Sequence, residues 1–275
     1  MRNAGLLFYK EYFKNLSFIE EAGKIKPVLE ENKTKECIQQ LFNSKLEKDT
    51  VTKISSVNAD FELITIYPGL LIGSGYNHEI GEQKNELKLG FFFDYTTGLP
   101  CIPGSSVKGV LRDACEKVNG DYVKSIIKEL ADGERKPEKS EVKEEAKKLS
   151  NGDLDKSFDK GKNSVFIAQV FAGKKDKDNY IAQKDRDIFF DAFPIESKND
   201  NGKFLANDYI TPHKDQFKDP KPIQFLKVLP QVIFQFNFRL TDTCINKAVK
   251  KELFRQILLD LGVGAKTNVG YGQFK

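Results

Sequence analysis

Tryptophan is absent from this sequence, methionine occurs only at its start, and histidine occurs twice, as His78 and His213. The cysteines are also few and widely separated, with no C-x-x-C pair and no histidine beside them: Cys37, Cys101, Cys115 and Cys244. A zinc site normally draws on closely spaced ligand pairs, so this spacing excludes the usual zinc motifs. We expect no metal and no cofactor, and we expect the thiols to be reduced and mostly buried.

Long apolar runs are missing as well. No run approaches the roughly 18 residues that a membrane-spanning helix requires. The first 20 residues mix aromatic side chains with Lys10, Glu11 and Lys14 and lack the apolar core of a signal peptide. These absences predict a soluble cytoplasmic protein that does not bind membranes.

What is present is an ordinary globular composition with a mild excess of positive charge. The 275 residues are 39% hydrophobic and 31% charged, with a formal net charge of +4. That length can bury one large core or two small ones. So small a charge excess is weak grounds for nucleic-acid binding, and any basic footprint must therefore be local.

Apolar and aromatic patterns predict the secondary structure of the main fold. The expected strands are 61–67, 91–93, 164–167, 187–193 and 232–240. Apolar residues at helical spacing predict helices over 105–118 and 242–261, the second ended by Gly262. This order predicts an α+β fold in which helices cover one face of an antiparallel sheet. A doubly wound parallel sheet would need strict alternation of strands and helices, which is not found.

Two segments stand apart from this pattern. Residues 1–55 have apolar positions at helical spacing on both sides of Pro27, and we expect them to form a helical N-terminal extension. Residues 56–275 then hold the main fold. Within them, 132–163 are dominated by Lys, Glu and Asp, which predicts a solvated helix, a flexible insertion, or both.

The segment 262–272 combines four glycines with a lysine and a tyrosine. Its glycines let the backbone approach an anion and turn amides toward it, the lysine adds charge, and the tyrosine offers a stacking face. The residues expected to contact such an anion are Gly264, Lys266, Thr267, Asn268 and Tyr271. The spacing fits neither a P-loop nor a dinucleotide-binding loop. The segment is therefore either an anion cradle or a tight turn that serves packing alone.

A second group of polar residues begins the helix expected at 105–118. The turn Gly104-Ser105-Ser106 can present free amides and the positive end of a helix dipole to a phosphate. Either serine can also cap the helix. Lys108 and Arg112 follow one turn apart, so both can reach the same anion. The alternative is a capped helix with two exposed cations.

Acid–base catalysis without a metal would need a group that titrates near neutral pH, and histidine is the usual one. His78 and His213 are each more easily explained as structural, because no second acid–base group accompanies either. Asp185, Asp187 and Asp191 could be offered as metal ligands, but we interpret them as the flanks of an apolar strand. We therefore expect no catalytic residue.

Together these segments resemble the RAMP (repeat-associated mysterious protein) superfamily of CRISPR proteins, whose hallmark is a glycine-rich C-terminal loop like the one at 262–274. More narrowly, four motifs resemble the family formed by the sixth subunit of the type III-B Cmr effector complex. They are IPGSSVKGVLR at 102–112, DAFP at 191–194, ITPH at 210–213 and PKPIQFL at 220–226. The resemblance covers about residue 60 to the end and leaves the first 50 residues unmatched.

The resemblance implies a ferredoxin-like (RRM-type) core, which in other members is joined by a degenerate second copy. It implies a non-catalytic, RNA-binding structural subunit that caps the backbone filament near the 3′ part of the guide RNA, in antiviral defence. The implied partners are guide RNA, target RNA and neighbouring RAMP subunits. In this family the backbone subunit that cleaves target RNA is a different polypeptide.

Two alternatives stay open. The chain could be a metal-independent CRISPR-repeat endoribonuclease that uses His78 or His213, or a purely structural cap that hardly touches RNA. On the leading interpretation, Lys108, Arg112 and Lys266 contact phosphate or lie near the RNA path. A modest net charge suffices there, because each subunit of a shared RNA scaffold neutralises only a few phosphates.

Overall fold

The strand with the clearest alternation, β8 (Val232–Arg239), is the centre of the main sheet in the computed structural model. β3 (Ala59–Ile64) runs antiparallel along one of its edges. β4 (Ile188–Phe189) and then β5 (Phe193–Ser197) pair antiparallel along the other edge. The structure describes residues 3–46, 55–80, 86–152, 154–159, 164–175, 179–211 and 222–275.

The main sheet has one apolar and one polar face, as the alternation predicts. Phe236 and Phe238 of β8 are buried. Phe61 of β3 stacks on Phe236, with 5.5 Å between the ring centroids. On the opposite face of β3, Asp60 and Glu62 are exposed. The apolar face therefore has to be covered, and the polar face can stay in water.

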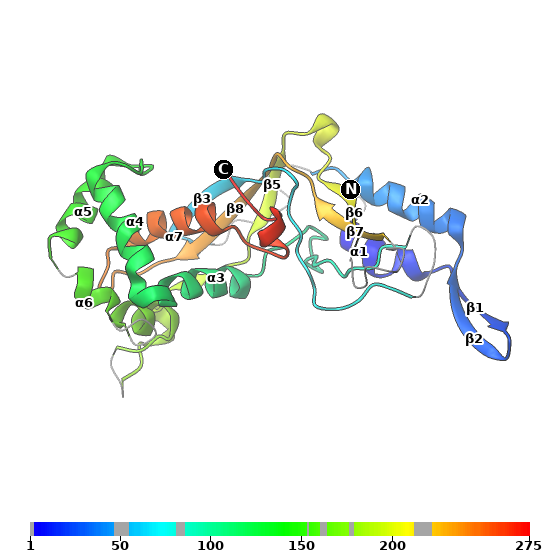
Figure 1. Cartoon of the computed structure of the whole chain (residues 1–275), viewed down its shortest axis with the longest axis horizontal. Helices are drawn as coiled ribbons and strands as arrows, with labels where there is room; N and C mark the ends of the chain where they lie inside the picture. Colours follow the sequence, from blue (N-terminus) through cyan, green and yellow to red (C-terminus); the bar gives the residue numbers. More distant parts are fainter. Residues whose placement is uncertain are drawn as a thin grey trace.

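Helices α3 (Gly104–Glu116) and α7 (Lys247–Leu261) lie over the apolar face (Figure 1). Phe254 of α7 lies with its ring centroid 5.8 Å from that of Phe238 and 5.7 Å from that of Phe189. Both helices occur where the sequence predicts them. The predicted arrangement, an antiparallel sheet with helices on one face, is confirmed.

The charged segment predicted as a solvated helix or a flexible insertion contributes to an outer helical layer. This layer contains α4 (Asp121–Asp132), α5 (Ser140–Ser150) and the short α6 (Leu154–Phe158). Val142 and Ala146 of α5 are buried, and α5 packs on α4. The solvated helix that the sequence predicts within 132–163 is therefore present as α5. No helix in the described part of the chain is long and apolar enough to cross a membrane.

The N-terminal region departs from the predicted helical extension. α1 (Ala4–Tyr9) and α2 (Glu31–Phe42) are helices, but β1 (Leu16–Glu21) and β2 (Lys24–Leu29) form an antiparallel hairpin between them. Figure 1 shows this hairpin standing away from one end of an elongated molecule. The helical prediction was wrong for residues 16–29, because apolar residues such as Phe18, 68% exposed, do not face the core. Their spacing therefore does not report a buried helix face.

A smaller sheet lies beside α2. Its strands β6 (Leu205–Ile210) and β7 (Ile223–Val228) are antiparallel, and α2 packs on β6. Leu70 exchanges two backbone hydrogen bonds with Val228, at 3.0 and 2.8 Å, which extends this sheet toward the main one. The motifs predicted at 210–213 and 220–226 fall partly outside the described residues.

The strand predicted at 91–93 does not form a ladder. This stretch is extended, and its backbone hydrogen-bonds to Ile72 on one side and to Cys101 on the other. Both partners lie in irregular segments, so no regular strand results. The strand predicted at 187–193 is split into β4 and β5, and β5 continues through Pro194 to Ser197.

The strand predicted at 164–167 is helical instead. Residues 165–171 form a helical segment that ends in a π-helical turn, Ile167–Phe171. Phe166 and Val170 are both buried, one helical turn apart. A window as short as four residues cannot distinguish a buried helix from a buried strand, which is why this prediction was wrong.

Candidate nucleic-acid interface

The C-terminal loop, residues 262–272, is fastened at its base. The amide of Val263 donates to the carbonyl of Gly272 at 2.9 Å, which closes the loop on itself. The amide of Ala265 donates to the carbonyl of Leu71 at 2.8 Å, which ties the loop to a neighbouring extended segment. Only the residues between these anchors form an exposed tip.

The glycines of the C-terminal loop are required for packing. A Cβ atom on Gly272 would lie 2.1 Å from the carbonyl oxygen of Val263. One on Gly264 would lie 2.6 Å from the carbonyl oxygen of Leu71. Both glycines also have positive φ, 71° and 109° respectively. The tight-turn interpretation therefore accounts for these glycines without a bound anion.

The tip of the loop consists of Lys266, Thr267 and Asn268. Lys266 adopts the left-handed conformation, with φ of 61°, and leads into the short 3-10 turn Thr267–Val269. Within the described chain, its ammonium has no carboxylate partner and the three tip amides have no backbone acceptor. The tip thus places a half-exposed cation beside unpaired N–H groups, a combination that suits an anion.

Tyr271 does not offer the predicted stacking face. Its side chain is only 9% exposed, and its ring packs edge-on against Phe225. Its hydroxyl donates to Oδ2 of Asp208 at 2.7 Å, and the same oxygen accepts from Nζ of Lys227 at 2.6 Å. The stacking prediction was wrong because the ring is used to join the loop to the β6–β7 sheet.

The start of α3 already holds a carboxylate of the protein itself. The amide of Gly104 donates to Oδ1 of Asp191 at 2.7 Å, and the amide of Ser106 donates to the carbonyl of Pro103 at 2.8 Å. Neither serine caps the helix, so the predicted serine cap was also wrong. The predicted cradle of free amides does not form here. The exposed hydroxyls of Ser105 and Ser106 are what this turn still presents.

Lys108 and Arg112 follow along α3. Nζ of Lys108 lies 5.8 Å from the centroid of the Phe189 ring. Burial lowers the pKa of the Lys108 ammonium, and the nearby charges of Arg112 and Arg186 lower it further. Arg112 pairs with Glu116 at 2.7 Å, whereas Lys108 has no carboxylate partner among the described residues. The two predicted cations are therefore neighbours on α3, and a third cation precedes β4, the strand on which α3 packs.

That third cation, Arg186, was not singled out from the sequence. It lies in a charged loop with as many acidic as basic neighbours, and no motif marks it. The one sequence feature that could have pointed to Arg186 is its position just before an apolar strand. Its proximity to α3 depends on the sheet, because Arg186 precedes β4 and α3 packs on β4.

A strip of three hydrogen-bonded segments, which contain Leu71, Phe92 and Cys101, lies between the C-terminal loop and α3. The carbonyl of Leu71 accepts from the C-terminal loop, and the carbonyl of Ile72 accepts from the amide of Phe92. The carbonyl of Phe92 in turn accepts from the amide of Cys101, just before α3 begins. The two groups of residues that the sequence singled out therefore flank the same strip.

His78 is placed for packing. Its side chain is 6% exposed, and its ring stacks on Phe8 with 3.9 Å between centroids. Nδ1 lies 2.9 Å from the carbonyl oxygen of Leu87, and Nε2 lies 2.9 Å from that of Phe8. Burial lowers the pKa of this imidazole despite the two oxygens. RNA has no access to the ring in this position, and His213 lies outside the described residues.

Two of the three aspartates that could have been metal ligands, Asp187 and Asp191, have structural partners, and Asp185 is exposed. Asp187 pairs with Nζ of Lys250 at 2.5 Å, with both side chains fully buried. Asp191 holds the start of α3. Among the described residues no three His, Cys, Asp or Glu side chains cluster as metal ligands would. All four cysteines are free thiols and three are buried, as predicted.

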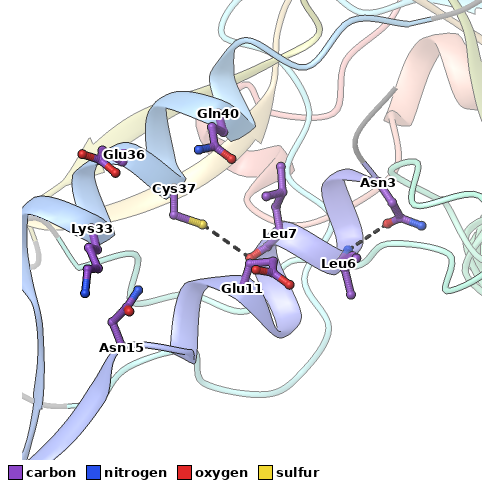
Figure 2. A pocket seen from close by; sticks show the side chains of 9 residues that line it. All are labelled: Asn3, Leu6, Leu7, Glu11, Asn15, Lys33, Glu36, Cys37 and Gln40. Carbon is purple, nitrogen blue, oxygen red and sulfur yellow. Dashed lines mark hydrogen bonds between the residues drawn. The ribbon is translucent and has the colours of Figure 1, made fainter.

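A cavity of about 460 Å³ lies between α1 and α2 (Figure 2). Its lining consists of Asn3, Leu6, Leu7, Glu11, Asn15, Lys33, Glu36, Cys37 and Gln40. The Cys37 thiol donates to the carbonyl of Leu7 at 3.6 Å. Burial raises the pKa of Cys37 to about 11, so the thiol stays protonated and is a poor nucleophile at neutral pH. None of the residues predicted to contact RNA lines this cavity.

Comparison with protein families matches residues 62–275 to the RAMP superfamily. The match spans the main sheet, α3, α7 and the C-terminal loop. The chain belongs to this superfamily, and the resemblance seen in its motifs is confirmed.

The chain is also similar to two proteins described as CRISPR system Cmr subunit Cmr6. It is 26% identical to that of Pyrococcus furiosus over 257 residues, which cover 83% of this chain and 71% of the relative. It is 24% identical to that of Saccharolobus solfataricus over 234 residues, which cover 83% of this chain and 61% of the relative. The chain therefore spans less than two thirds of the second relative.

Among solved structures, the chain is similar to one chain of the cryo-EM structure of the type III-B Cmr-beta bound to cognate target RNA. The TM-score is 0.55 at 21% identity, with 90% of this chain and 73% of that chain covered. At this identity the likeness shows a shared fold.

Proposed function

We propose that the chain is a non-catalytic, RNA-binding structural subunit of a type III-B CRISPR (Cmr) ribonucleoprotein effector complex, acting in antiviral defence. It caps the backbone filament near the 3′ part of the guide RNA and contacts neighbouring RAMP subunits, with target RNA as a further partner. The superfamily match and the two relatives named Cmr6 support this proposal. So does the likeness to a chain from a Cmr complex that holds target RNA.

One observation carries the RNA-binding part of the proposal. Lys266 at the loop tip and Lys108 on α3 are both cations without a carboxylate partner in the described chain, and one strip of chain lies between them. Unpaired cations on both sides of a strip suit the phosphates of a single strand. The accessible groups of Ser105, Ser106, Thr267 and Asn268 would add hydrogen bonds there.

The proposed core is ferredoxin-like, with residues 1–55 as an extension and 132–163 as an insertion. On this view the β6–β7 sheet is the candidate for a degenerate second copy. RRM-type sheets present aromatic side chains to RNA. The corresponding face here presents Asp60 and Glu62, which repel phosphate. RNA would therefore follow the helix and loop side of the molecule and avoid the open face of the sheet.

The test measures binding of a fluorescein-labelled single-stranded guide RNA by anisotropy over a range of salt concentrations. For the variant Lys108→Ala/Arg112→Ala/Lys266→Ala we expect weaker binding and a salt slope shallower by about 2, because about 0.7 is lost for each phosphate contact. The control Lys35→Ala/Lys128→Ala/Lys148→Ala removes three charges from α2, α4 and α5. Equal effects of the two variants, or no effect of either, would overturn the RNA-binding proposal.

The non-catalytic part has its own test. Purified chain is incubated with CRISPR-repeat RNA in the presence of a chelator, and the products are separated on a denaturing gel. We expect no site-specific cleavage. Cleavage that is lost on His213→Ala or His78→Ala would instead identify the chain as a metal-independent endoribonuclease.

A further inference from the structure

Arg186 is held in a fixed position with the end of its side chain free. Its Nε donates to the carbonyl of Ile181 at 2.7 Å. The guanidinium also packs so closely on Gly173 that a Cβ there would lie 2.6 Å from Nε. Among the described residues no acceptor contacts its two terminal amino groups. A fixed guanidinium with two free donors has the geometry that binds a phosphate through two hydrogen bonds.

Positive charge gathers where α3 packs beside Arg186. Arg186 lies just before β4, α3 packs on β4, and Nζ of Lys108 is 5.8 Å from the ring centroid of Phe189 in that strand. Burial lowers the pKa of Lys108, and the charges of Arg112 and Arg186 lower it further. Glu116 offsets only Arg112, and Lys108 has no carboxylate partner in the described part of the chain. Like charges gathered on a surface repel one another, and a bound anion would relieve that repulsion.

An exposed aromatic ring stands beside this cluster. The amide of Ile181 donates to the carbonyl of Gly173 at 2.9 Å, and Lys174 and Tyr180 form an isolated antiparallel bridge. These contacts hold the Tyr180 ring outward, where it is 66% exposed. Nζ of Lys174 lies 5.3 Å from its centroid. An exposed ring backed by a cation suits the stacking of a nucleobase.

We propose that Arg186, Lys108 and Arg112 bind the phosphates of one stretch of single-stranded RNA, and that Tyr180 stacks on a base of the same stretch. This inference rests on the RNA-binding function proposed above. It extends the RNA path beyond the tip of the C-terminal loop and α3, to the loop that carries Tyr180 and Arg186. Arg186 supplies a two-pronged phosphate contact, and Tyr180 fixes the base without reading its identity, because every base has a face that can stack.

The experiment uses the full chain and the same labelled single-stranded RNA. For Arg186→Gln we expect the salt slope to fall by about 0.7, while Arg186→Lys keeps the slope because it keeps the charge. For Tyr180→Ala we expect roughly tenfold weaker binding, while Tyr180→Phe keeps wild-type affinity because it keeps the ring. Tyr209→Ala, which removes another exposed tyrosine from β6, is the matched control. Thermal unfolding of every variant confirms that it is folded.

A second readout locates the base directly. Guide RNA substituted with 5-iodouridine is irradiated in the assembled complex, and the adducts are mapped by mass spectrometry. An adduct on the peptide that contains Tyr180, lost in Tyr180→Ala, is the expected result. Absence of any adduct on that peptide at every substituted position would overturn the stacking assignment.

The outcomes also separate this inference from the proposed function. If the triple variant of Lys108, Arg112 and Lys266 loses affinity while Arg186→Gln and Tyr180→Ala bind normally, the proposed function stands and this inference is wrong. If none of these variants changes binding, both are wrong. If Tyr180→Ala binds RNA normally but no longer enters the complex, the loop is a protein contact and the inference is overturned.

Discussion

The carboxylate of Asp191 accepts a hydrogen bond from the backbone amide of Gly104 across 2.7 Å. Asp191 lies between β4 and β5, and Gly104 is the first residue of α3, so this contact fixes the helix to the edge of the main sheet. A carboxylate at this end of a helix also complements its dipole. The protein's own anion thus takes the place that a phosphate could have taken, and the RNA contacts proposed for α3 fall to side chains further along the helix.

Loss of the Asp191 carboxylate should destabilise the fold. We expect Asp191→Ala to lower the free energy of unfolding by about 1 to 2 kcal/mol, as loss of a helix cap does. Asp191→Asn keeps an acceptor and should cost roughly half as much. Urea unfolding followed by circular dichroism measures both. The control is Asp113→Ala, which removes an exposed ion pair with Lys117 and should cost well under about 1 kcal/mol. Equal stability of Asp191→Ala and wild type would contradict this role.

Substitution of glycine by alanine should destabilise the protein at Gly272, in the C-terminal loop, and stabilise it at Gly109, in α3. At Gly272 a Cβ would meet the carbonyl oxygen of Val263 at 2.1 Å and φ is 71°, so Gly272→Ala should cost about 2 kcal/mol or more. At Gly109, inside α3, a Cβ has no neighbour within 4 Å. Gly109→Ala should therefore stabilise the protein by about 0.5 to 1 kcal/mol. Thermal unfolding compares them, and two shifts of the same sign would disprove the distinction.

Burial of His78 should make stability depend on pH near neutrality. Its pKa is lowered in the folded state by burial, so the unfolded chain binds the proton more readily. The free energy of unfolding should therefore fall as the pH drops below about 6.5, the ordinary value for histidine. In His78→Gln this contribution should disappear, and the pH dependence that remains should be that of the other titratable groups, including His213. NMR titration gives the pKa itself, and a value above about 6.5 for His78 would contradict the prediction.

The contact between Tyr271 and Asp208 should anchor the C-terminal loop. Burial raises the pKa of the Asp208 carboxyl, but the hydrogen bonds from Lys227 and Tyr271 outweigh it, and the net pKa is lowered. The stabilisation is therefore present above the ordinary pKa of aspartate, about 3.9, and is lost as the pH falls through the lower folded value. At neutral pH, Tyr271→Phe should cost about 1 to 2 kcal/mol in urea unfolding.

The matched control for Tyr271→Phe is Tyr209→Phe. The Tyr209 hydroxyl accepts an exposed hydrogen bond from the side-chain amide of Asn207 and has no other partner among the described residues. This substitution should leave stability almost unchanged. Suppose instead that Tyr271→Phe and wild type have the same free energy of unfolding at neutral pH, and that it falls equally in both as the pH is lowered. The Tyr271 hydroxyl would then not anchor the loop.

Elements with a long, regular apolar pattern were predictable from the sequence. The alternation in β8 and the helical spacing in α3 and α7 report burial directly, because the residues that recur on one face are the residues that the core covers. The hairpin β1–β2 broke this rule. Its apolar residues, among them Phe18 and Ile25, are exposed, so their spacing carried no information about which face is buried.

Some residues of the candidate interface could be predicted from the sequence, and others could not. Lys108 and Arg112 could be paired from the sequence, because one helical turn brings them together. Arg186 could not, because its approach to Lys108 needs β4 to pair with β8 and α3 to pack on β4. Tyr271 was misread for a related reason: its sequence neighbours are small and polar, and its ring is buried by Phe225 from a distant strand.

The sequence by itself determined the class of fold, the two helices on the main sheet and the superfamily, and it supplied the charged residues that the proposal assigns to RNA. These depend on local periodicity and on motifs, which are written along the chain. The tertiary structure alone decided which of the charged and aromatic residues are accessible. It placed Asp191 against the amide of Gly104, buried the ring of Tyr271 and packed the helix of Lys108 on the strand that follows Arg186, because such contacts arise only when segments far apart in the chain pack together.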